Sequence, residues 1–239
     1  MIIAGQSGKF MIKLHSLVPL SMVALLLTAI SMPANASCSD WSSPGVDWTG
    51  CKKTHKMLDH QDFSKAKFDR TNMSFGQLDH SDFFAASMVR VNLSRSNVRN
   101  SNFEQADLSR SVGYYTDFSS SRFISTLMTK SEFSRASFNK ALFQQVDWSR
   151  AELGRTEFVD ARLEDVTFEF SNLSRAQFTG ATLHRVNLEG AYTFRTRFEA
   201  VDLSGTRNLT QSQLDNACGD SNTLLPPGLE KPLGWPCVE

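Results

Sequence analysis

Two sets of cationic side chains recur every twenty residues and are the first candidates for binding chemistry. The first set consists of Arg70, Arg90, Arg110, Lys130 and Arg150. The second contains Arg135, Arg155, Arg175 and Arg195, preceded by Arg95 and interrupted by Tyr115. If each set is stacked at the spacing of neighbouring strands, about 5 Å, its like charges repel unless anions neutralise them.

Two interpretations of these cations remain open. They can form an ordinary solvated surface in which acids of adjacent columns neutralise them, or a stripe that binds phosphates, lipid headgroups or an acidic partner. The overall charge does not decide between them, because the repeated region holds 19 Lys+Arg and 19 Asp+Glu. The acids available for internal pairing are Asp107, Asp147, Glu132 and Glu152.

A second cluster comes from a duplicated hexapeptide, Leu-Asp-His-x-Asp-Phe, at residues 58–63 and 78–83. The duplication would stack imidazole on imidazole and carboxylate on carboxylate, a donor set that could hold a divalent metal. Duplication alone also produces such pairs, which then only exchange hydrogen bonds. The candidate ligands are His60, His80, Asp59 and Asp79.

Signatures of catalysis are missing from the sequence. It contains no G-x-S-x-G, no H-E-x-x-H, no glycine-rich phosphate loop and no Cys/His nucleophile arrangement. We therefore expect a non-catalytic protein without a cofactor.

The elements that must position these groups follow a five-residue period from Lys56 to Gly205. Positions ending in 3 or 8 carry a large apolar residue in 28 of 30 cases, the exceptions being Gly113 and Thr193. A small side chain stands two residues before nearly every one of them. Neither a helix nor an ordinary strand has this period. It indicates a solenoid, in which each coil buries its apolar face against the next.

The repeats resemble the A-[DN]-L-x-x motif of the pentapeptide-repeat family, as in residues 106–110, 171–175 and 186–190. The resemblance covers about 150 of the 239 residues. It implies an all-β fold, a right-handed quadrilateral β-helix of about 7.5 coils. At Gly113 we expect a bulge that turns Val112 or a tyrosine inward. Local repacking and a ligand niche are both open there and at Thr193.

The first 36 residues have the parts of a secretory signal peptide. A positively charged start is followed by an apolar run, residues 17–30, and by an A-x-A site ending at Ala36. We expect cleavage after Ala36 and a periplasmic or secreted protein, with translation beginning at Met1 or Met11. The apolar run is too short to favour a membrane span. No transmembrane span is expected after cleavage.

All four cysteines lie outside the repeats, and an even number in an exported chain argues for two disulfides. The stacked coils separate Cys51 from Cys218 by far more than the roughly 7 Å that a disulfide allows. We therefore expect the local bridges Cys38–Cys51 and Cys218–Cys237.

The flanking segments should cover the open ends of the solenoid. Residues 37–55 are expected to lie across the first coil as an N-terminal cap. Residues 206–239 are expected to form a short C-terminal helix and an extended tail. A capping box at Thr210–Gln213 starts the helix, and Trp235 anchors the tail. Capped ends favour a monomer.

These observations predict an exported interaction or scaffold protein that binds a protein partner or a polyanionic component of the cell envelope. The resemblance supplies an alternative, because the best-known family members mimic DNA and bind gyrase. Those members are strongly acidic and act in the cytosol. A neutral coil with cationic columns and an export signal argues against DNA mimicry, and a nucleic acid partner is not expected.

Overall fold

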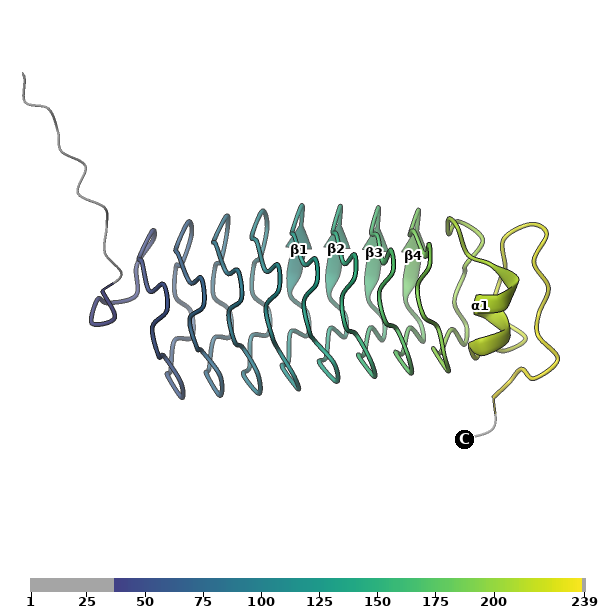
Figure 1. Cartoon of the computed structure of the whole chain (residues 1–239), viewed down its shortest axis with the longest axis horizontal. Coiled ribbons are helices and arrows are strands. Elements are labelled where there is room, and N and C mark those ends of the chain that lie inside the picture. Colours follow the sequence, from purple (N-terminus) through teal and green to yellow (C-terminus); the bar gives the residue numbers. More distant parts are fainter. Residues whose placement is uncertain (1–36, 238–239) are drawn as a thin grey trace, which may run out of the picture. The chain divides into compact units, whose positions relative to one another are not determined.

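Parallel pairing between residues twenty apart organises the chain. A computed structural model describes residues 37–237, so the predicted signal peptide, residues 1–36, lies outside the described part. Four short strands form one parallel sheet in sequence order, with Phe123 opposite Phe143 and Phe143 opposite Leu163 (Figure 1). The strands are β1 (Arg122–Ile124), β2 (Leu142–Gln144), β3 (Arg162–Glu164) and β4 (Thr182–His184).

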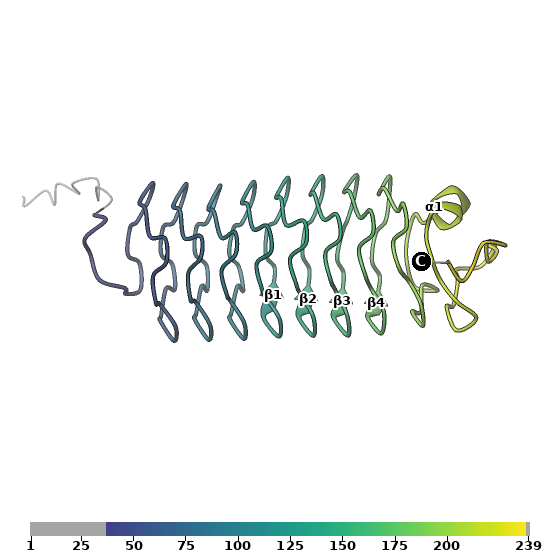
Figure 2. The same cartoon turned by 90° about the horizontal axis from the view of Figure 1, so that it is seen from below.

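The remaining sides of each coil are joined by single parallel bridges. Asn92 pairs with Val112, Asn97 with Asp117, and Asp107 with Leu127. Bridging positions recur every five residues and pair across twenty, so each coil has four pairing sides (Figures 1 and 2). The predicted all-β solenoid is confirmed, and this pairing agrees with a quadrilateral coil.

Large apolar side chains fill the inside of the coil, as the five-residue period predicts. Phe103, Phe123 and Phe143 have no exposed surface, and neighbouring ring centroids in this stack are 4.9 Å apart. The small polar residues beside them are also satisfied: the hydroxyl of Thr156, for example, donates to the carbonyl oxygen of Phe133 at 3.0 Å. Such hydrogen bonds offset the cost of burying a hydroxyl group.

The corners of the coil hold non-glycine residues in the left-handed conformation. Gln145, Arg155 and Arg175 have φ values of 55°, 61° and 58°. Such a conformation costs a non-glycine residue roughly 1–2 kcal/mol. Hydrogen bonds between coils offset this cost, as where the amides of Arg155 and Arg175 each donate to a carbonyl of the next coil at 2.8 Å.

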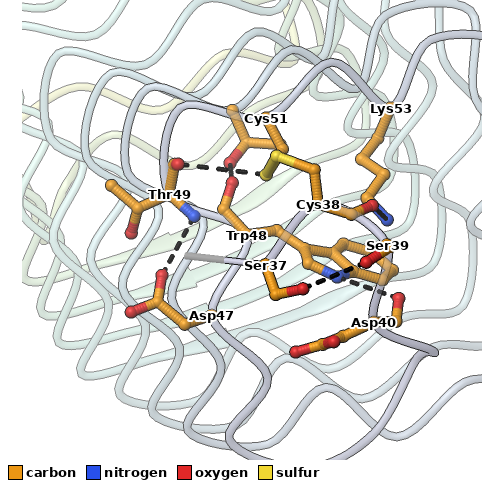
Figure 3. The surroundings of a disulfide bond; sticks show 10 residues. Ser37, Cys38, Ser39, Asp40, Asp47, Trp48, Thr49, Cys51 and Lys53 are labelled. Atoms are coloured by element: carbon orange, nitrogen blue, oxygen red, sulfur yellow. Dashed lines mark hydrogen bonds between the residues drawn. A yellow bond between two sulfur atoms is a disulfide. The ribbon is translucent and has the colours of Figure 1, made fainter. Parts of the chain in front are cut away.

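The coil begins before its predicted start at Lys56. The first bridge joins Asp47 to Lys67, and Trp48 is buried inside the coil rather than lying across its end. Lys53 occupies a central position, buried with its ammonium 3.4 Å from the Trp48 ring centroid and 2.9 Å from the carbonyl oxygen of Cys38 (Figure 3). The five-residue period did not predict this coil, because a lysine stands where an apolar residue was expected.

The C-terminal end is covered by α1 (Gln211–Asn216) and by the tail (Figure 1). Thr210 and Gln213 form the predicted capping box, and Leu214 is buried. The tail adds bridges of its own to the last coil, where Cys218 pairs with Arg197 and Leu224 with Asp202. No helix within residues 37–237 is long and apolar enough to cross a bilayer.

Both disulfides have the predicted pairing. Cys38 is bonded to Cys51 beside Trp48, with their Cα atoms 5.5 Å apart (Figure 3). Cys218 is bonded to Cys237, with a Cα separation of 5.4 Å. The indole nitrogen of Trp235 donates to the carbonyl oxygen of Ala217 at 2.8 Å, which holds the tail against the end of α1.

Candidate anion-binding corner

The predicted cations lie at two corners of the coil. Each column occupies one corner and contributes one residue to every coil that it spans. All of them are exposed, and all have positive φ. We call Arg70, Arg90, Arg110, Lys130 and Arg150 the first cation column. We call Arg135, Arg155, Arg175 and Arg195 the arginine column.

Neither column forms an ion pair with any described residue. Across residues 37–237, the ion pairs involve other cations, and none of them includes a member of either column. The internal pairing considered from the sequence therefore does not form.

The four acids that could have supplied it are engaged elsewhere. Asp107 and Asp147 each accept the amide of the residue two positions on, at 2.8 Å. Glu152 accepts the amide group of Asn172 at 2.9 Å. Glu132 accepts the hydroxyl of Tyr114, and this hydrogen bond, aided by burial, raises the pKa of Tyr114 to about 12. The phenol stays protonated at neutral pH and keeps Glu132 occupied.

Two grooves flank the arginine column. The serine groove, about 400 Å³, has Ser134, Gly154 and Ser174 beside the arginines and ends at Tyr192 and Phe194. The disulfide groove, about 560 Å³, is lined by the same arginines, by Glu157, Gln177 and Arg197, and by the Cys218–Cys237 bridge. Arg135, Arg155 and Arg175 line both grooves, so a ligand can reach their guanidinium groups from either side. The first cation column lines neither groove.

The same corner is rich in aromatic rings in the earlier coils. His55 stacks on Phe75 with ring centroids 4.8 Å apart. Arg95 lies between two rings, 5.7 Å from the centroid of Phe75 and 5.8 Å from that of Tyr115. Arg135 donates to the Tyr115 hydroxyl and lies over the same ring. Arg195 lies 5.9 Å from the centroid of the Phe194 ring. Aromatic faces stabilise a nearby cation, so the unsupported members of the arginine column are Arg155 and Arg175.

The duplicated hexapeptide does not assemble a metal centre. The rings of His60 and His80 stack nearly parallel, 4.7 Å apart, so their nitrogens lie side by side instead of converging. Asp79 forms an ion pair with Arg99 at 2.6 Å, and the carboxylate of Asp59 accepts the backbone amide of Asp79 at 2.9 Å. Residues 37–237 contain no group of three or more potential metal ligands. The arrangement fits duplicated segments that exchange hydrogen bonds.

The two irregular core positions are filled by the protein. The bulge expected at Gly113 is wrong: Asn92 still pairs with Val112 in register, and Tyr114 and Tyr115 remain exposed. The ring of Phe133 occupies the space, since a Cβ on Gly113 would lie 2.5 Å from Phe133 Cδ1.

At the other irregular position, the Thr193 hydroxyl donates to the carbonyl oxygen of Gln213 in α1 at 2.7 Å. Both irregularities are therefore local repacking.

Comparison with family models identifies the repeats. A model described as "Pentapeptide repeat region" matches residues 116–193, and one described as "Pentapeptide repeats (8 copies)" matches residues 91–129. Together the two matches identify residues 91–193 of this chain as pentapeptide repeats. Three members of the arginine column, Arg135, Arg155 and Arg175, stand within the first match. No curated protein was found that matches the chain.

Solved structures with detectable similarity include pentapeptide-repeat proteins. HetL from the cyanobacterium Nostoc sp. strain PCC 7120, described as involved in heterocyst differentiation regulation, is 16% identical; the match covers 79% of this chain and 86% of HetL, with a TM-score of 0.39. QnrB1, a plasmid-mediated fluoroquinolone resistance protein, is 17% identical over 76% of this chain and 90% of that one, with a TM-score of 0.43. The solenoid assignment rests on the pairing described above.

The sequence identified the cations but not the grooves beside them. The signal was present, because Ser134, Gly154 and Ser174 are small residues twenty apart that directly precede three of the arginines. Two coils away in either direction the same position carries Tyr114 or Phe194. The loss of bulk at three successive coils opens the serine groove.

Proposed function

We propose that this chain is a non-catalytic, exported binding protein that captures a linear polyanion through its arginine column. Four guanidinium groups lie one per coil at one corner, exposed and without a carboxylate partner among the described residues. Guanidinium groups form bidentate, charge-assisted hydrogen bonds with carboxylate, phosphate and sulfate oxygens. The absence of ion pairs to these arginines within residues 37–237 is the observation that carries the proposal.

Export is supported by two features of the chain. The first 36 residues match the signal-peptide pattern, and disulfides such as Cys38–Cys51 persist mainly in oxidising compartments. The alternative of a DNA-mimicking, gyrase-binding protein is disfavoured by the same corner. A surface that imitates DNA presents rows of anions, whereas this corner presents rows of cations.

The test measures binding of the disulfide-bonded chain to labelled long-chain polyphosphate, a polyanion with neither bases nor sugars. We expect binding at low salt that weakens steeply as salt rises. The double substitution Arg155→Gln/Arg175→Gln should weaken it at least tenfold. Glutamine suits this turn, since Gln105 and Gln145 stand at equivalent corners with positive φ.

The matched control is Arg90→Gln/Arg110→Gln, which removes the same charge from the first cation column. It should weaken binding less than threefold, because those arginines line neither groove. If the wild-type chain does not bind polyphosphate at low salt, or if both double variants lose affinity equally, the arginine column is not the binding site.

A further inference from the structure

The serine groove has a polar floor with unused hydrogen-bonding groups. The hydroxyls of Ser134 and Ser174 make no hydrogen bond with any other described residue, although both are only partly exposed. Gly154 lies between them; a Cβ there would sit 3.7 Å from the Ser134 hydroxyl and 3.4 Å from that of Ser174. The φ of Gly154 is not in the positive range, so the backbone does not require glycine at this position. Its effect is to keep the groove open.

The chemistry of this groove changes along its length. The hydroxyls of Ser134 and Ser174 line it beside Arg135 and Arg175, and an aromatic platform closes one end. The rings of Tyr192 and Phe194 stack 6.3 Å apart, and both are exposed. Hydroxyl donors, guanidinium groups and a terminal aromatic platform suit a ligand that has many hydroxyls, repeated negative charges and an apolar ring face.

We propose that the serine groove binds a linear acidic polysaccharide that runs along the solenoid axis, with a carboxylate or sulfate of successive sugars on successive arginines. The arginines repeat at the inter-strand spacing, about 4.8 Å per coil. A pyranose unit in an extended chain has a similar length, so one chain can contact several coils. Sugar hydroxyls bond to Ser134 and Ser174, and a sugar ring packs on Tyr192.

A single-stranded nucleic acid fits this groove less well. Proteins that bind single strands without sequence preference stack successive bases on aromatic side chains set among the cations. Here the residues between Tyr115 and Tyr192 that line the groove include no aromatic ring. Bases would therefore lack stacking partners along most of the groove, whereas sugar hydroxyls find hydrogen-bonding partners throughout.

This inference rests on the proposed polyanion binding, and the experiment separates the two. Binding of the full disulfide-bonded chain is compared for polygalacturonate, its methyl ester, oligothymidylate of equal charge and polyphosphate, all at one ionic strength. We expect polygalacturonate to bind at least tenfold more tightly than oligothymidylate. Esterification should abolish binding, because it removes the carboxylate charge.

The diagnostic variant is Gly154→Tyr, which fills the groove without changing any charge. The solenoid accepts tyrosine at this turn position, as Tyr114 shows in an earlier coil. It should weaken polygalacturonate binding at least tenfold and polyphosphate binding less than threefold. Ser149→Tyr places the same side chain beside Arg150 of the first cation column and should change neither.

A second variant guards against a folding defect. Ser134→Ala/Ser174→Ala removes only the two free hydroxyls and should weaken polygalacturonate binding three- to tenfold with unchanged polyphosphate binding. Oligothymidylate binding as tight as polygalacturonate, or full polygalacturonate binding by Gly154→Tyr, would overturn the polysaccharide assignment and leave the arginine column as a general polyanion site. If the wild-type chain binds none of these polymers, the proposed function is wrong as well.

Discussion

Two ladders with the same repeat run through this solenoid, one inside it and one outside. Inside, Phe83, Phe103, Phe123 and Phe143 stack with neighbouring ring centroids 4.8 to 4.9 Å apart. Outside, Arg135, Arg155, Arg175 and Arg195 follow the same twenty-residue interval. Like stacks on like in both, yet the energetic consequences have opposite signs.

The interior ladder is complete without any partner. Each added phenylalanine buries apolar surface against its neighbours, so repetition stabilises the coil. Each added arginine places a positive charge beside another one, so repetition costs free energy until an anion arrives. Folding alone explains a repeat whose members attract one another. A repeat whose members repel one another indicates a binding partner outside the chain.

The largest expected effect comes from interrupting the interior ladder. Phe123→Ala removes a fully buried ring that stacks on both Phe103 and Phe143 and meets Phe118 and Phe138 edge-on. We expect the free energy of unfolding to fall by about 3–5 kcal/mol, measured by urea denaturation with the disulfides intact. A loss below about 1 kcal/mol would show that the interior ladder is not the source of stability.

A smaller loss is expected where the interior ladder has already adjusted. Gly113→Ala would place a methyl group against the Phe133 ring and should cost about 1–3 kcal/mol by overpacking. In a Phe133→Leu background, Gly113→Ala should cost less free energy of unfolding, because the shorter side chain vacates the contested space. Simple additivity of the two substitutions in denaturation experiments would mean that Phe133 does not fill the Gly113 gap.

The sequence predicts the interior ladder more completely than the exterior one. The interior pattern shows directly in a five-residue period, because burial selects residues by type, and the end helix follows from the capping box at Thr210. The coil around Lys53 was not predicted, because a charged residue stands at an apolar position. The Trp48 ring and a carbonyl oxygen stabilise the charge of this lysine. The filling of the Gly113 gap likewise depends on a neighbour twenty residues away.

The candidate site was only partly predictable, since exterior residues are not selected by burial. The columns of cations were visible, but their lack of partners was not. Asp107 and Asp147 were expected to face cations and instead hold backbone amides of their own turns. The serine groove depends on which side chains adjoin each other across coils, and a fixed period describes only which positions point inward.

The outer corner itself offers the sharpest comparison, because it contains supported and unsupported arginines. Arg95 lies between the rings of Phe75 and Tyr115, so Arg95→Gln should lower the free energy of unfolding by about 0.5–1 kcal/mol. Arg175 stands between two other arginines. Arg175→Gln should therefore raise the free energy of unfolding at low salt, by up to about 0.5 kcal/mol, because it relieves repulsion.

Salt provides the control for this pair of substitutions. In about 1 M salt the Debye length falls to about 3 Å, and the gain from Arg175→Gln should vanish while most of the loss from Arg95→Gln remains. Chemical denaturation with urea, which is uncharged, measures both. If Arg175→Gln destabilises the chain at low salt, the arginine column contributes to folding, and the argument that it awaits an external anion fails.

The smallest expected effect concerns an exterior cation that does have an internal partner. Burial raises the pKa of Asp79, but its hydrogen bonds to Arg99 and the charge of that guanidinium outweigh burial, so the net pKa lies below the ordinary value of 3.8. A lowered folded-state pKa means that the stabilisation is present above the unfolded pKa and is lost as the pH falls through the folded pKa. Asp79→Asn should therefore lower the melting temperature at pH 6 by at most about 2 °C. The difference from wild type should shrink as the pH falls below 3.8 and through the lowered folded-state pKa, which melting curves recorded between pH 6 and acidic pH would show. A difference that persists unchanged at low pH would mean that Asp79 acts through its hydrogen bonds alone, and that even the paired cations outside the coil add nothing to its stability.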